Sequence, residues 1–396
     1  MAQRSPQMPA GTAEVLHAAE TGIGGINTVI LGLGERQVER FGPERVHVLV
    51  PRNHAADFAG TALVTHVFER DARGLRALLG FSLNLARLVL TLKPSFVILH
   101  SSFAGLAGRL VLLALRPVRR PVVIYCAHGW AFTMAVSERR KRLFAAVERR
   151  LAPLAAAIVN ISEAEHEAAL SAGLPPERLH FIQNGTPRAS TEPGGSPYPD
   201  RPGRLTLLFV GRLDKQKGFD LLATALAENP QLPIDVVVVG RPVAGPVTVP
   251  HVPNVTYVGW LRREDLAPYY AHADAVAVPS RWEGYGLVAA EALSYGTPVI
   301  ASRVGGLATL VEDGVSGFLF DPDAPDALVA ILSKLDRARL RGMRPAALRR
   351  WKQVADLQVM EGRYFKLMQS LAAEGHHVQA SEVGLETLQR GRDATG

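Results

Sequence analysis

The sequence has little cysteine and no long apolar segment. Its single cysteine, Cys126, excludes a disulfide framework and a cysteine-rich metal cluster. The chain has no uninterrupted run of the ~18 apolar residues that span a bilayer; Leu110–Leu115 is short and lies between two arginines. The opening residues MAQRSPQMPAGTAE lack an apolar core, so we expect no signal peptide. These absences favour a cytoplasmic protein, with the inner face of the plasma membrane as a place of contact.

Aromatic residues are also few, at 7%, and no nucleic-acid-binding motif is present. The formal net charge of +7 favours an acidic partner, which could be nucleic acid, a phosphorylated substrate or an anionic membrane, and the two absences count against nucleic acid. The charge is uneven: residues 1–187 hold 21 basic and 14 acidic side chains (21 − 14 = +7), and residues 188–396 hold 23 of each. The excess therefore belongs to the first half of the chain.

One basic segment of the first half has helical periodicity. In SERRKRLFAAVERRLAPL the apolar positions Leu143, Phe144, Val147 and Leu151 recur at helical spacing among the cations of Arg139–Arg150. Two interpretations stay open. The segment is a basic amphipathic helix that lies on an anionic membrane, or it is the solvated face of an ordinary surface helix.

At 396 residues the chain exceeds the size of one hydrophobic core, so we expect two domains. Short apolar runs alternate with helix-period stretches, stop at a polar segment rich in Pro and Gly (186–204), and then begin again. Such runs indicate parallel sheets covered on both faces. The strand-like runs are Val46–Val50, Phe96–His100, Val122–Cys126, Ala157–Ile161, Leu205–Val210, Ile234–Val239, Val255–Val258, Ala275–Val278 and Pro298–Ala301.

We therefore predict an α/β protein of two doubly wound Rossmann-like domains, with ligands bound at the carboxyl ends of the strands. The predicted segments are an N-terminal domain (1–186), a C-terminal domain (187–350), a helix (351–372) and a flexible tail (373–396).

The densest motif is PSRWEGYGLVAAEALSYGTPVIASRVGGLATLVEDGVSGFLF, residues 279–320. A strand ends before it, a glycine-bearing loop follows, and Leu287–Tyr295 opens a helix. The first amides of that helix, at Gly286, Leu287 and Val288, would point at an anion. This loop and helix are therefore a candidate phosphate site.

Two carboxylates flank this site, and two cations lie in a second motif. Glu283 precedes the helix and Glu291 lies about one turn inside it, where each could accept hydrogen bonds from sugar hydroxyls; alternatively, both are solvated acids favoured by the helix dipole. In FVGRLDKQKGFDLLATAL, Arg212 and Lys217 follow a strand. Two fixed cations there can neutralise a diphosphate without a metal. A surface pair near a helix start is the alternative, although that position favours acids.

Other chemically capable residues also have plain interpretations. His128, after an apolar strand, is either a site residue or a hydrogen-bonded loop histidine. Trp130 and Phe132 are core residues or a platform for an acceptor sugar. The Asp321–Asp323 triplet is a turn or helix start, and the acids of 163–167 are scattered around a helix, so neither forms a metal site.

The run from 204 to about 335 resembles the donor domain of family 4 retaining glycosyltransferases, which have the GT-B fold. The matching segments are GRLDKQKG, two glutamates separated by seven residues, GTPVIAS, and VGGLATLVEDGVSGFLF followed by aspartate-proline. The first half is similar over less: a glycine pair before a helical run, CAHGWAF and NGT. The resemblance implies two Rossmann-like domains with a cleft between them, and a C-terminal helix (351–370) that crosses back to the first domain.

The resemblance also implies roles for single residues. Arg212 and Lys217 would bind the donor's diphosphate. Glu291 would hold the ribose hydroxyls, and Glu283 would contact the donor sugar near the reacting centre. His128 would contact the transferred sugar. The remaining implied residues are Gly211, Gly284, Gly286, Leu287 and Val288 for the donor, and Gly24, Gly25, Asn27 and Trp130 for the approach of phosphate and acceptor.

The expected activity is transfer of a hexosyl group from a UDP- or GDP-sugar to a hydroxyl, with retention and without metal or cofactor. The two cations and the helix amides would stabilise the leaving diphosphate. The sequence is similar to bacterial enzymes of exopolysaccharide, capsule or lipopolysaccharide assembly, which implies a glycan or a polyprenyl-diphosphate-linked glycan as acceptor. The alternatives are a nucleotide-sugar epimerase or hydrolase of the same fold, and a basic nucleic-acid-binding protein.

Overall fold

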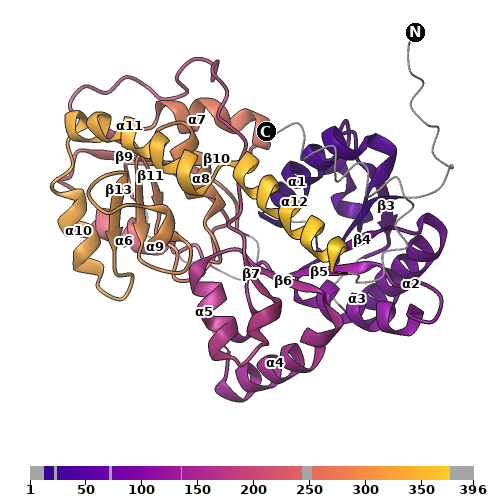
Figure 1. Ribbon diagram of the computed structural model, residues 1–396. Helices are drawn as coiled ribbons and strands as arrows, with labels where there is room; N and C mark the ends of the chain where they lie inside the picture. The colour runs from indigo at the N-terminus through magenta and orange to yellow at the C-terminus, as the bar shows by residue number, and fades with distance from the viewer. Residues whose placement is uncertain (1–12, 22–24, 71–73, 135, 243–251, 375–396) are drawn as a thin grey trace, which may run out of the picture. The chain divides into compact units, whose positions relative to one another are not determined.

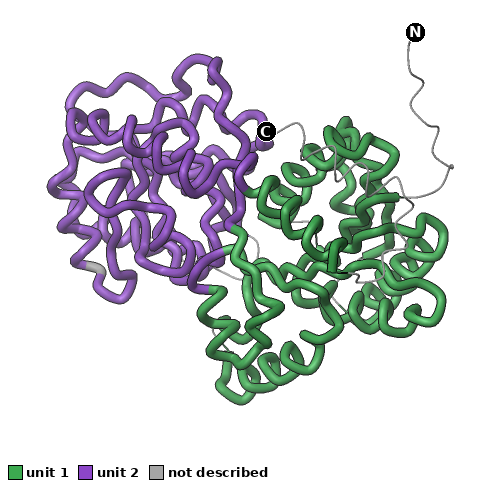
Figure 2. Tube along the Cα trace, viewed as in Figure 1, with its two compact units in different colours: residues 1–161, 165–182, 360–396 green, residues 162–164, 183–359 purple. Residues whose placement is uncertain are grey.

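A computed structural model describes residues 13–21, 25–70, 74–134, 136–242 and 252–374. The chain forms two compact units, each built on one sheet of parallel strands (Figures 1 and 2). The division places residues 1–161, 165–182 and 360–396 in the first unit, and residues 162–164 and 183–359 in the second. The predicted α/β class with two doubly wound units is confirmed.

The first unit has a seven-stranded sheet in the order β3-β2-β1-β4-β5-β6-β7. Helices cover both faces, so every residue of β1, β2, β4 and β5 is buried. The strands are β1 (Val15–Ala19), β2 (Val46–Pro51), β3 (Val64–Phe68), β4 (Phe96–His100), β5 (Val122–Cys126), β6 (Ala157–Asn160) and β7 (Leu179–Phe181), and the helices are α1 (Gly25–Phe41), α2 (Leu75–Leu92), α3 (Ser102–Leu115), α4 (Glu138–Leu151) and α5 (Glu163–Ser171).

The second unit has a six-stranded sheet in the order β10-β9-β8-β11-β12-β13, with a core of its own. The strands are β8 (Leu205–Val210), β9 (Ile234–Val239), β10 (Val255–Gly259), β11 (Ala275–Val278), β12 (Val299–Ser302) and β13 (Gly317–Phe320), and the helices are α6 (Phe219–Glu228), α7 (Ala267–His272), α8 (Leu287–Ser294), α9 (Leu307–Leu310), α10 (Pro325–Leu332) and α11 (Arg337–Val354).

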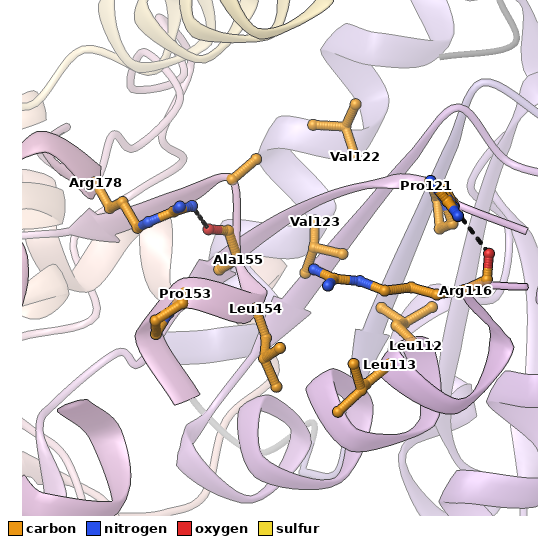
Figure 3. Close-up of a pocket in the computed structure, with 12 residues that line it drawn as sticks. Leu112, Leu113, Arg116, Pro121, Val122, Val123, Pro153, Leu154, Ala155 and Arg178 are labelled. Atoms are coloured by element: carbon orange, nitrogen blue, oxygen red, sulfur yellow. Dashed lines mark hydrogen bonds between the residues drawn. The ribbon is translucent and has the colours of Figure 1, made fainter. Parts of the chain in front are cut away.

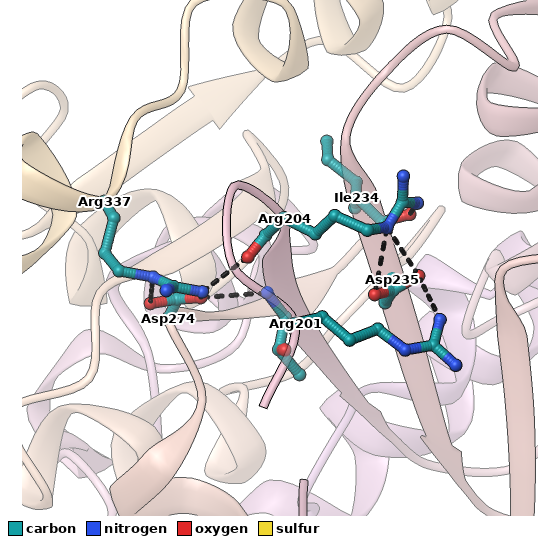
Figure 4. A network of polar contacts seen from close by, with 7 residues as sticks. Arg201, Arg204, Ile234, Asp235, Asp274 and Arg337 are labelled. Atoms are coloured by element: carbon teal, nitrogen blue, oxygen red, sulfur yellow. Dashed lines mark hydrogen bonds and ion pairs between the residues drawn. The ribbon is translucent and has the colours of Figure 1, made fainter. Parts of the chain in front are cut away.

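Charged pairs tie together the amino edge of the second sheet (Figure 4). The Arg204 guanidinium lies 3.1 Å from both carboxylate oxygens of Asp235, which Arg201 also contacts at 3.2 Å. Arg337, the first residue of α11, donates from Nε to Asp274 at 3.0 Å. Because Asp274 immediately precedes β11, this pair fixes the start of α11 against the sheet. The arginines and aspartates at this edge serve the fold.

The helix predicted over 351–372 is interrupted. Helix α11 ends within it at Val354, and a separate helix, α12 (Leu357–Ala373), begins after two intervening residues. Between them the backbone pairs with Thr186, whose N–H donates to Ala355 at 2.8 Å and whose carbonyl accepts from Leu357 at 3.1 Å. These bonds occupy backbone groups that a continuous helix would use for itself. The division into units assigns α12 from Met360 onward to the first unit.

Candidate active site

The two motifs of the second half of the chain meet at one point of the second sheet. Strand order reverses at β8, which has β9 on one side and β11 on the other. Sheets of this kind bind ligands outside the carboxyl ends of the strands at such a reversal. The loop 211–218 follows β8, and the loop 279–286 follows β11. The topology therefore brings the predicted cations and the predicted carboxylate together at a ligand-binding position.

Lys217 and Glu283, from these two loops, contact each other directly. Lys217 Nζ lies 2.5 Å from Glu283 Oε2, and the Ser280 hydroxyl lies 3.4 Å from the same oxygen. Both charged side chains are largely but not wholly covered, with 20% and 12% exposure. From the sequence, Lys217 was predicted to bind the donor's diphosphate and Glu283 to contact the donor sugar. In this structure they form one ion pair, which would have to open or rearrange for a diphosphate to bind the lysine.

Arg212 is held within its own loop. Its guanidinium pairs with Asp214 Oδ2 at 3.0 Å and donates to Gln216 Oε1 at 2.7 Å. The other Asp214 oxygen accepts from the Lys217 amide at 3.0 Å, so one aspartate orients both cation-bearing residues. Sequence reasoning missed Asp214 and Gln216, although both lie inside GRLDKQKG. Gly211, at the start of the loop, donates its amide to Val239 at 2.9 Å and so extends the sheet.

Two glycines let the loops of this edge approach each other closely. Gly218 has φ of 64°, and a Cβ there would lie 2.0 Å from the Pro279 carbonyl oxygen. Gly305, after β12, has φ of 48°, and a Cβ there would lie 1.8 Å from the Glu283 carbonyl oxygen. Only a residue without a side chain fits either position. VGGLATL was quoted for its resemblance, but Gly305 was missed as a residue that positions Glu283.

The α8 N-terminus presents backbone donors beside Glu283. Gly286 is its N-cap, with φ of 99° and no side-chain capping bond. The amides of Leu287 and Val288 fall in the first turn, where an α-helix offers no backbone acceptor. Gly284 accepts at its carbonyl from Gly306 at 3.2 Å, which fixes the loop before the helix. This arrangement suits a phosphate or another anion.

Glu291 lies inside α8 and is buried. The Tyr270 hydroxyl donates to its Oε2 at 2.7 Å, and the Arg263 guanidinium lies 3.9 Å from Oε1. Burial raises the pKa of the Glu291 carboxyl, while Arg263 and Tyr270 oppose that rise. Tyr270 in turn stacks on Tyr295. From the sequence, Glu291 was predicted to hold ribose hydroxyls. Tyr270, whose hydroxyl donates to one of the two carboxylate oxygens of Glu291, was not found.

In the first unit the predicted glycine pair is only half described, because Gly24 lies outside the described residues. Gly25 begins α1, as expected. Asn27, in the first turn, is buried and donates from Nδ2 to Asp57 at 2.6 Å. The asparagine proposed for phosphate or acceptor approach therefore has a partner within its own unit. Asp57 was not found from the sequence.

His128 ends a row of three stacked imidazoles. His17 in β1 and His100 at the end of β4 are bonded at 3.0 Å, and His100 and His128 at 2.8 Å. At the far end, His17 Nε2 lies 2.6 Å from Gln37 Oε1 in α1. Neighbouring rings lie 5.1–5.2 Å apart and are inclined by 22°. The row crosses the sheet from the inside of the unit to the carboxyl edge, because β1, β4 and β5 are adjacent.

All three imidazoles are uncharged at neutral pH. Burial lowers the pKa of His17 and that of His128 from 6.5 to about 4, and burial together with the neighbouring imidazoles holds the pKa of His100 well below its usual range. A neutral imidazole has one donor and one acceptor nitrogen. Since Gln37 Oε1 accepts from His17, each ring in turn donates from Nε2, and His128 is left with an unprotonated Nδ1. His128 has φ of 53°, a strained conformation for a residue with a side chain.

Trp130 is a core residue and not a platform for an acceptor. Its side chain has 0% exposure and stacks on Phe132, and its indole N–H donates to Asn160 Oδ1 at 3.0 Å. The prediction that Trp130 contributes to the approach of the acceptor is corrected by this burial. Nearby, buried Glu165 accepts from the amides of Ile161 and Gly129, and burial raises the pKa of its carboxyl to about 7. Its place beneath the loop of His128 could not be read from the sequence.

Within the described residues, no three or more His, Cys, Asp or Glu side chains are grouped so that they could hold a metal ion. Asp321 accepts at Oδ1 from the Asp323 amide at 2.9 Å, in a turn before α10. The only helix of the described chain long and apolar enough to cross a bilayer is α2. It connects β3 to β4 and buries Phe81, Leu85 and Val89 in the core.

Two doubly wound units, one with cations, carboxylates and helix amides at its strand-order reversal, define a GT-B glycosyltransferase. Residues 204–337 match the family described as glycosyl transferases group 1, and residues 24–185 match the glycosyl transferase 4-like domain. A protein of the cps region of Klebsiella pneumoniae, described as uncharacterized, is 30% identical over 80% of this chain and 88% of its own length. The chain belongs to the group 1, family 4-like glycosyltransferases.

More distant similarities agree with this assignment. The D-inositol 3-phosphate glycosyltransferase of Nocardia farcinica is 39% identical over a region that covers 37% of each chain. Anabaena HepE, crystallised with UDP and glucose, aligns with a TM-score of 0.72 and 20% identity, over 90% of this chain and all of its own. The lipopolysaccharide outer core galactosyltransferase WaaB aligns with a TM-score of 0.62 and 17% identity, over 90% and 99% of the two chains. The structural alignments show a shared fold.

Proposed function

We propose that this protein transfers a hexosyl group from a nucleotide diphosphate sugar to a hydroxyl of a glycan or lipid-linked glycan. The observation that carries the proposal is the meeting of Lys217, Glu283 and the α8 N-terminus at one carboxyl edge of the second sheet. The Klebsiella relative from a cps region and the likeness to WaaB support a place in cytoplasmic assembly of cell-surface polysaccharide. The Anabaena neighbour with UDP supports a UDP-sugar ahead of a GDP-sugar.

The chemistry asked of this edge is charge stabilisation. As the sugar leaves, negative charge grows on the diphosphate and positive charge on the anomeric carbon. After Lys217 has exchanged Glu283 for the diphosphate, the Lys217 and Arg212 cations and the amides of Leu287 and Val288 surround the leaving group, so little further reorganisation accompanies the reaction itself. These groups can do what a divalent metal does in other transferases, and we propose transfer without a metal. Once Lys217 turns to the diphosphate, Glu283 is free to accept from a sugar hydroxyl.

Retention of configuration is part of the proposal. With donor bound in the second unit, a hydroxyl that attacks from the side of the leaving diphosphate can pass its proton to a phosphate oxygen as the glycosidic bond forms. We propose that His128 contacts the transferred sugar through Nδ1, the nitrogen that the imidazole row leaves without a proton.

A donor screen with three variants tests the proposal. Thermal shift and hydrolysis are first measured across UDP- and GDP-sugars, and transfer is then followed with the donor that binds. Lys217→Ala and Glu283→Ala should each abolish transfer while the melting temperature stays close to wild type. Lys215→Ala, an exposed lysine of the same loop, is the matched control and should keep full activity.

Two results would count against the proposal. Full transfer by Lys217→Ala or Glu283→Ala would refute the site assignment. Equal turnover of the donor with and without any acceptor, giving an altered or hydrolysed sugar, would show the epimerase or hydrolase alternative.

A further inference from the structure

One outer face of the first unit is unusually apolar. Helix α2 buries Ala77, Phe81 and Leu85 against the sheet, yet its opposite side exposes leucines at spacings of four, four and seven residues. Leu75 and Leu83 are 73% and 71% exposed. The exposed leucines of this helix are Leu75, Leu79, Leu83 and Leu90.

The neighbouring helix continues the same face. Helix α3 packs beside α2, and α4 packs beside α3. Phe103, Leu110 and Leu113 of α3 are exposed at helical spacing, and Val118 just beyond it is 64% exposed. Of the sixteen large apolar residues exposed in the described chain, ten lie between Leu75 and Leu143. We call the exposed apolar side chains of 75–118 the α2–α3 face. Monomeric proteins rarely expose apolar area so concentrated without a partner for it.

The same stretch contains no acidic residue. From residue 72 to residue 137 the sequence has no Asp or Glu over 66 positions and has eight Lys or Arg. Because α2 and α3 come from this stretch, neither helix contributes an acidic side chain to the face, while Arg76 and Arg87 of α2 and Arg116 just beyond α3 are exposed. The basic residues of Arg139–Arg150 on α4 lie at its border. A partner for this face must therefore be both apolar and anionic.

A pocket of about 380 Å³ lies at the C-terminal end of α3 (Figure 3). Its floor is apolar, with Leu113, Val123 and Leu154, and Arg116, Arg120 and Arg178 stand around it. Leu113 also belongs to the α2–α3 face, so the pocket and the face are continuous. Figure 3 shows the Arg116 side chain reaching across the pocket toward Val123.

The three arginines of this pocket have no carboxylate partner in the part of the chain that the structure describes. Arg120 donates to the Arg116 carbonyl at 2.9 Å, and Arg178 donates to the Ala155 carbonyl at 2.5 Å. Cations at the end of α3 also complement the helix dipole, which accounts for their position but not for the apolar floor between them. Cations around an apolar floor suit a phosphate ester that bears a hydrocarbon chain.

We propose that the α2–α3 face docks on an anionic phospholipid bilayer, with the arginine pocket holding a lipid headgroup phosphate. The leucines enter the boundary of headgroups and acyl chains, while the cations meet the anionic surface. This moves the membrane contact predicted at Arg139–Arg150. In α4 only Leu143 is an exposed large apolar residue, because Phe144 packs against the core.

A second copy of this chain is a poorer occupant. A two-fold symmetric contact would set each face against its own copy, and so bring the exposed arginines of one copy, Arg76, Arg87, Arg116 and Arg120, toward those of the other. The membrane supplies the negative charge that a second copy lacks. Docking would hold the first unit at the surface where a lipid-linked acceptor lies, so the inference extends the proposed function without depending on transfer.

Sedimentation of the full chain with lipid vesicles tests this, in the absence of any sugar donor. Wild type should bind vesicles of phosphatidylcholine mixed with phosphatidylglycerol and should bind pure phosphatidylcholine weakly. Leu79→Glu/Leu83→Glu should weaken binding by roughly tenfold or more for each leucine lost. Arg116→Glu/Arg120→Glu changes four charges, each worth about fivefold, and should weaken binding at least 100-fold.

Leu170→Glu is the control, because Leu170 is exposed on α5 between acidic residues and outside the α2–α3 face. It should bind as wild type does. All variants are checked for unchanged thermal unfolding, since every substituted side chain is exposed.

Three outcomes would overturn the inference. Equal binding by wild type and the double-leucine variant would remove the α2–α3 face from the contact. A loss in the leucine variant with none in the arginine variant would refute the headgroup pocket. A wild-type dimer in light scattering that the leucine variant loses, with no vesicle binding, would show that a second copy covers this face. Transfer to a soluble acceptor, measured on the same samples, reports separately on the proposed function.

Discussion

Glu165 and the imidazole row should respond to acid in opposite ways, and one substitution separates them. The folded-state pKa of His17 is lowered to about 4, so on acidification the unfolded chain takes up protons first and stability is lost as the pH falls below 6.5. The folded-state pKa of Glu165 is raised to about 7, so between pH 7 and its unfolded value of 4.5 the folded chain binds the extra proton. Acidification therefore stabilises the fold through Glu165.

These shifts give magnitudes that can be measured. Between pH 7 and pH 5, linkage gives a loss of about 1.8 kcal/mol through His17 and a gain of about 2 kcal/mol through Glu165. His128, whose pKa is also lowered to about 4, adds a further loss in the same direction as His17, and wild type and variant share it. In Glu165→Gln the gain is absent. The variant should therefore lose about 2 kcal/mol more than wild type over this range.

Guanidinium unfolding at both pH values measures the difference, and hydrogen exchange in peptides of β1 and β4 assigns it to the first unit. The other carboxyls and imidazoles of this unit whose pKa is shifted cancel, because wild type and variant share them; besides the histidines named above they are Glu14, His47, His54, His66, His100, Glu138 and His180. Glu167→Gln, an exposed carboxyl on the same helix, is the control and should follow wild type. Parallel losses in wild type and Glu165→Gln would show that Glu165 is ionised in the fold at pH 5, and would refute the reasoning.

Three further substitutions test other parts of the structure. Gly305→Ala should destabilise the fold by about 1–3 kcal/mol and impair transfer, since a positive φ and a backbone oxygen both oppose the new Cβ; wild-type melting and activity would contradict this. Tyr270→Phe removes the donor to Glu291 and should raise the pKa of that carboxyl, so the KM for the nucleotide sugar should increase; an unchanged KM between pH 5 and 8 would exclude the contact from donor binding. Arg109→Ala leaves the buried Glu148 carboxylate without its cation, with only the Tyr125 hydroxyl as a donor, and should cost about 3–5 kcal/mol in chemical unfolding, whereas a loss below about 1 kcal/mol would mean that the ion pair adds nothing.

The fold could be predicted from the sequence because fully buried parallel strands are continuous apolar runs. Phe96–His100, Val122–Cys126 and Ile234–Val239 have the predicted bounds. Strands β1, β3, β7 and β13 are not among the predicted runs, and the first two are atypical of buried strands. β1, Val15–Ala19, is short and has a histidine at its centre, and β3, Val64–Phe68, is a half-buried edge strand whose sequence includes polar residues. Their positions are decided by pairing with neighbours that a local pattern does not contain.

The sequence predicts which residues belong to the candidate site, but it does not predict the contacts that they make with one another. The motifs identify Lys217 and Glu283, yet they lie 66 positions apart, and nothing in the sequence says that their charges meet. The same is true of Trp130, because the sequence around an aromatic residue that follows a strand is the same whether its side chain faces a ligand or the core. The end of α11 was missed for a related reason. The helix stops where the backbone pairs with Thr186, which is far away in the sequence.

The imidazole row couples a helix side chain to the edge of the sheet. Each ring holds one proton, so the three rings and the Gln37 amide have only two fully bonded arrangements, related by a turn of that amide. When the Gln37 amide oxygen faces His17, Nδ1 of His128 carries no proton and can only accept a hydrogen bond. When the Gln37 amide nitrogen faces His17, each ring carries its proton on Nδ1, and Nδ1 of His128 becomes a donor. A group at the carboxyl edge thus meets an acceptor or a donor according to the orientation of one amide in α1, four side chains away, and no charge has to enter the core for the exchange.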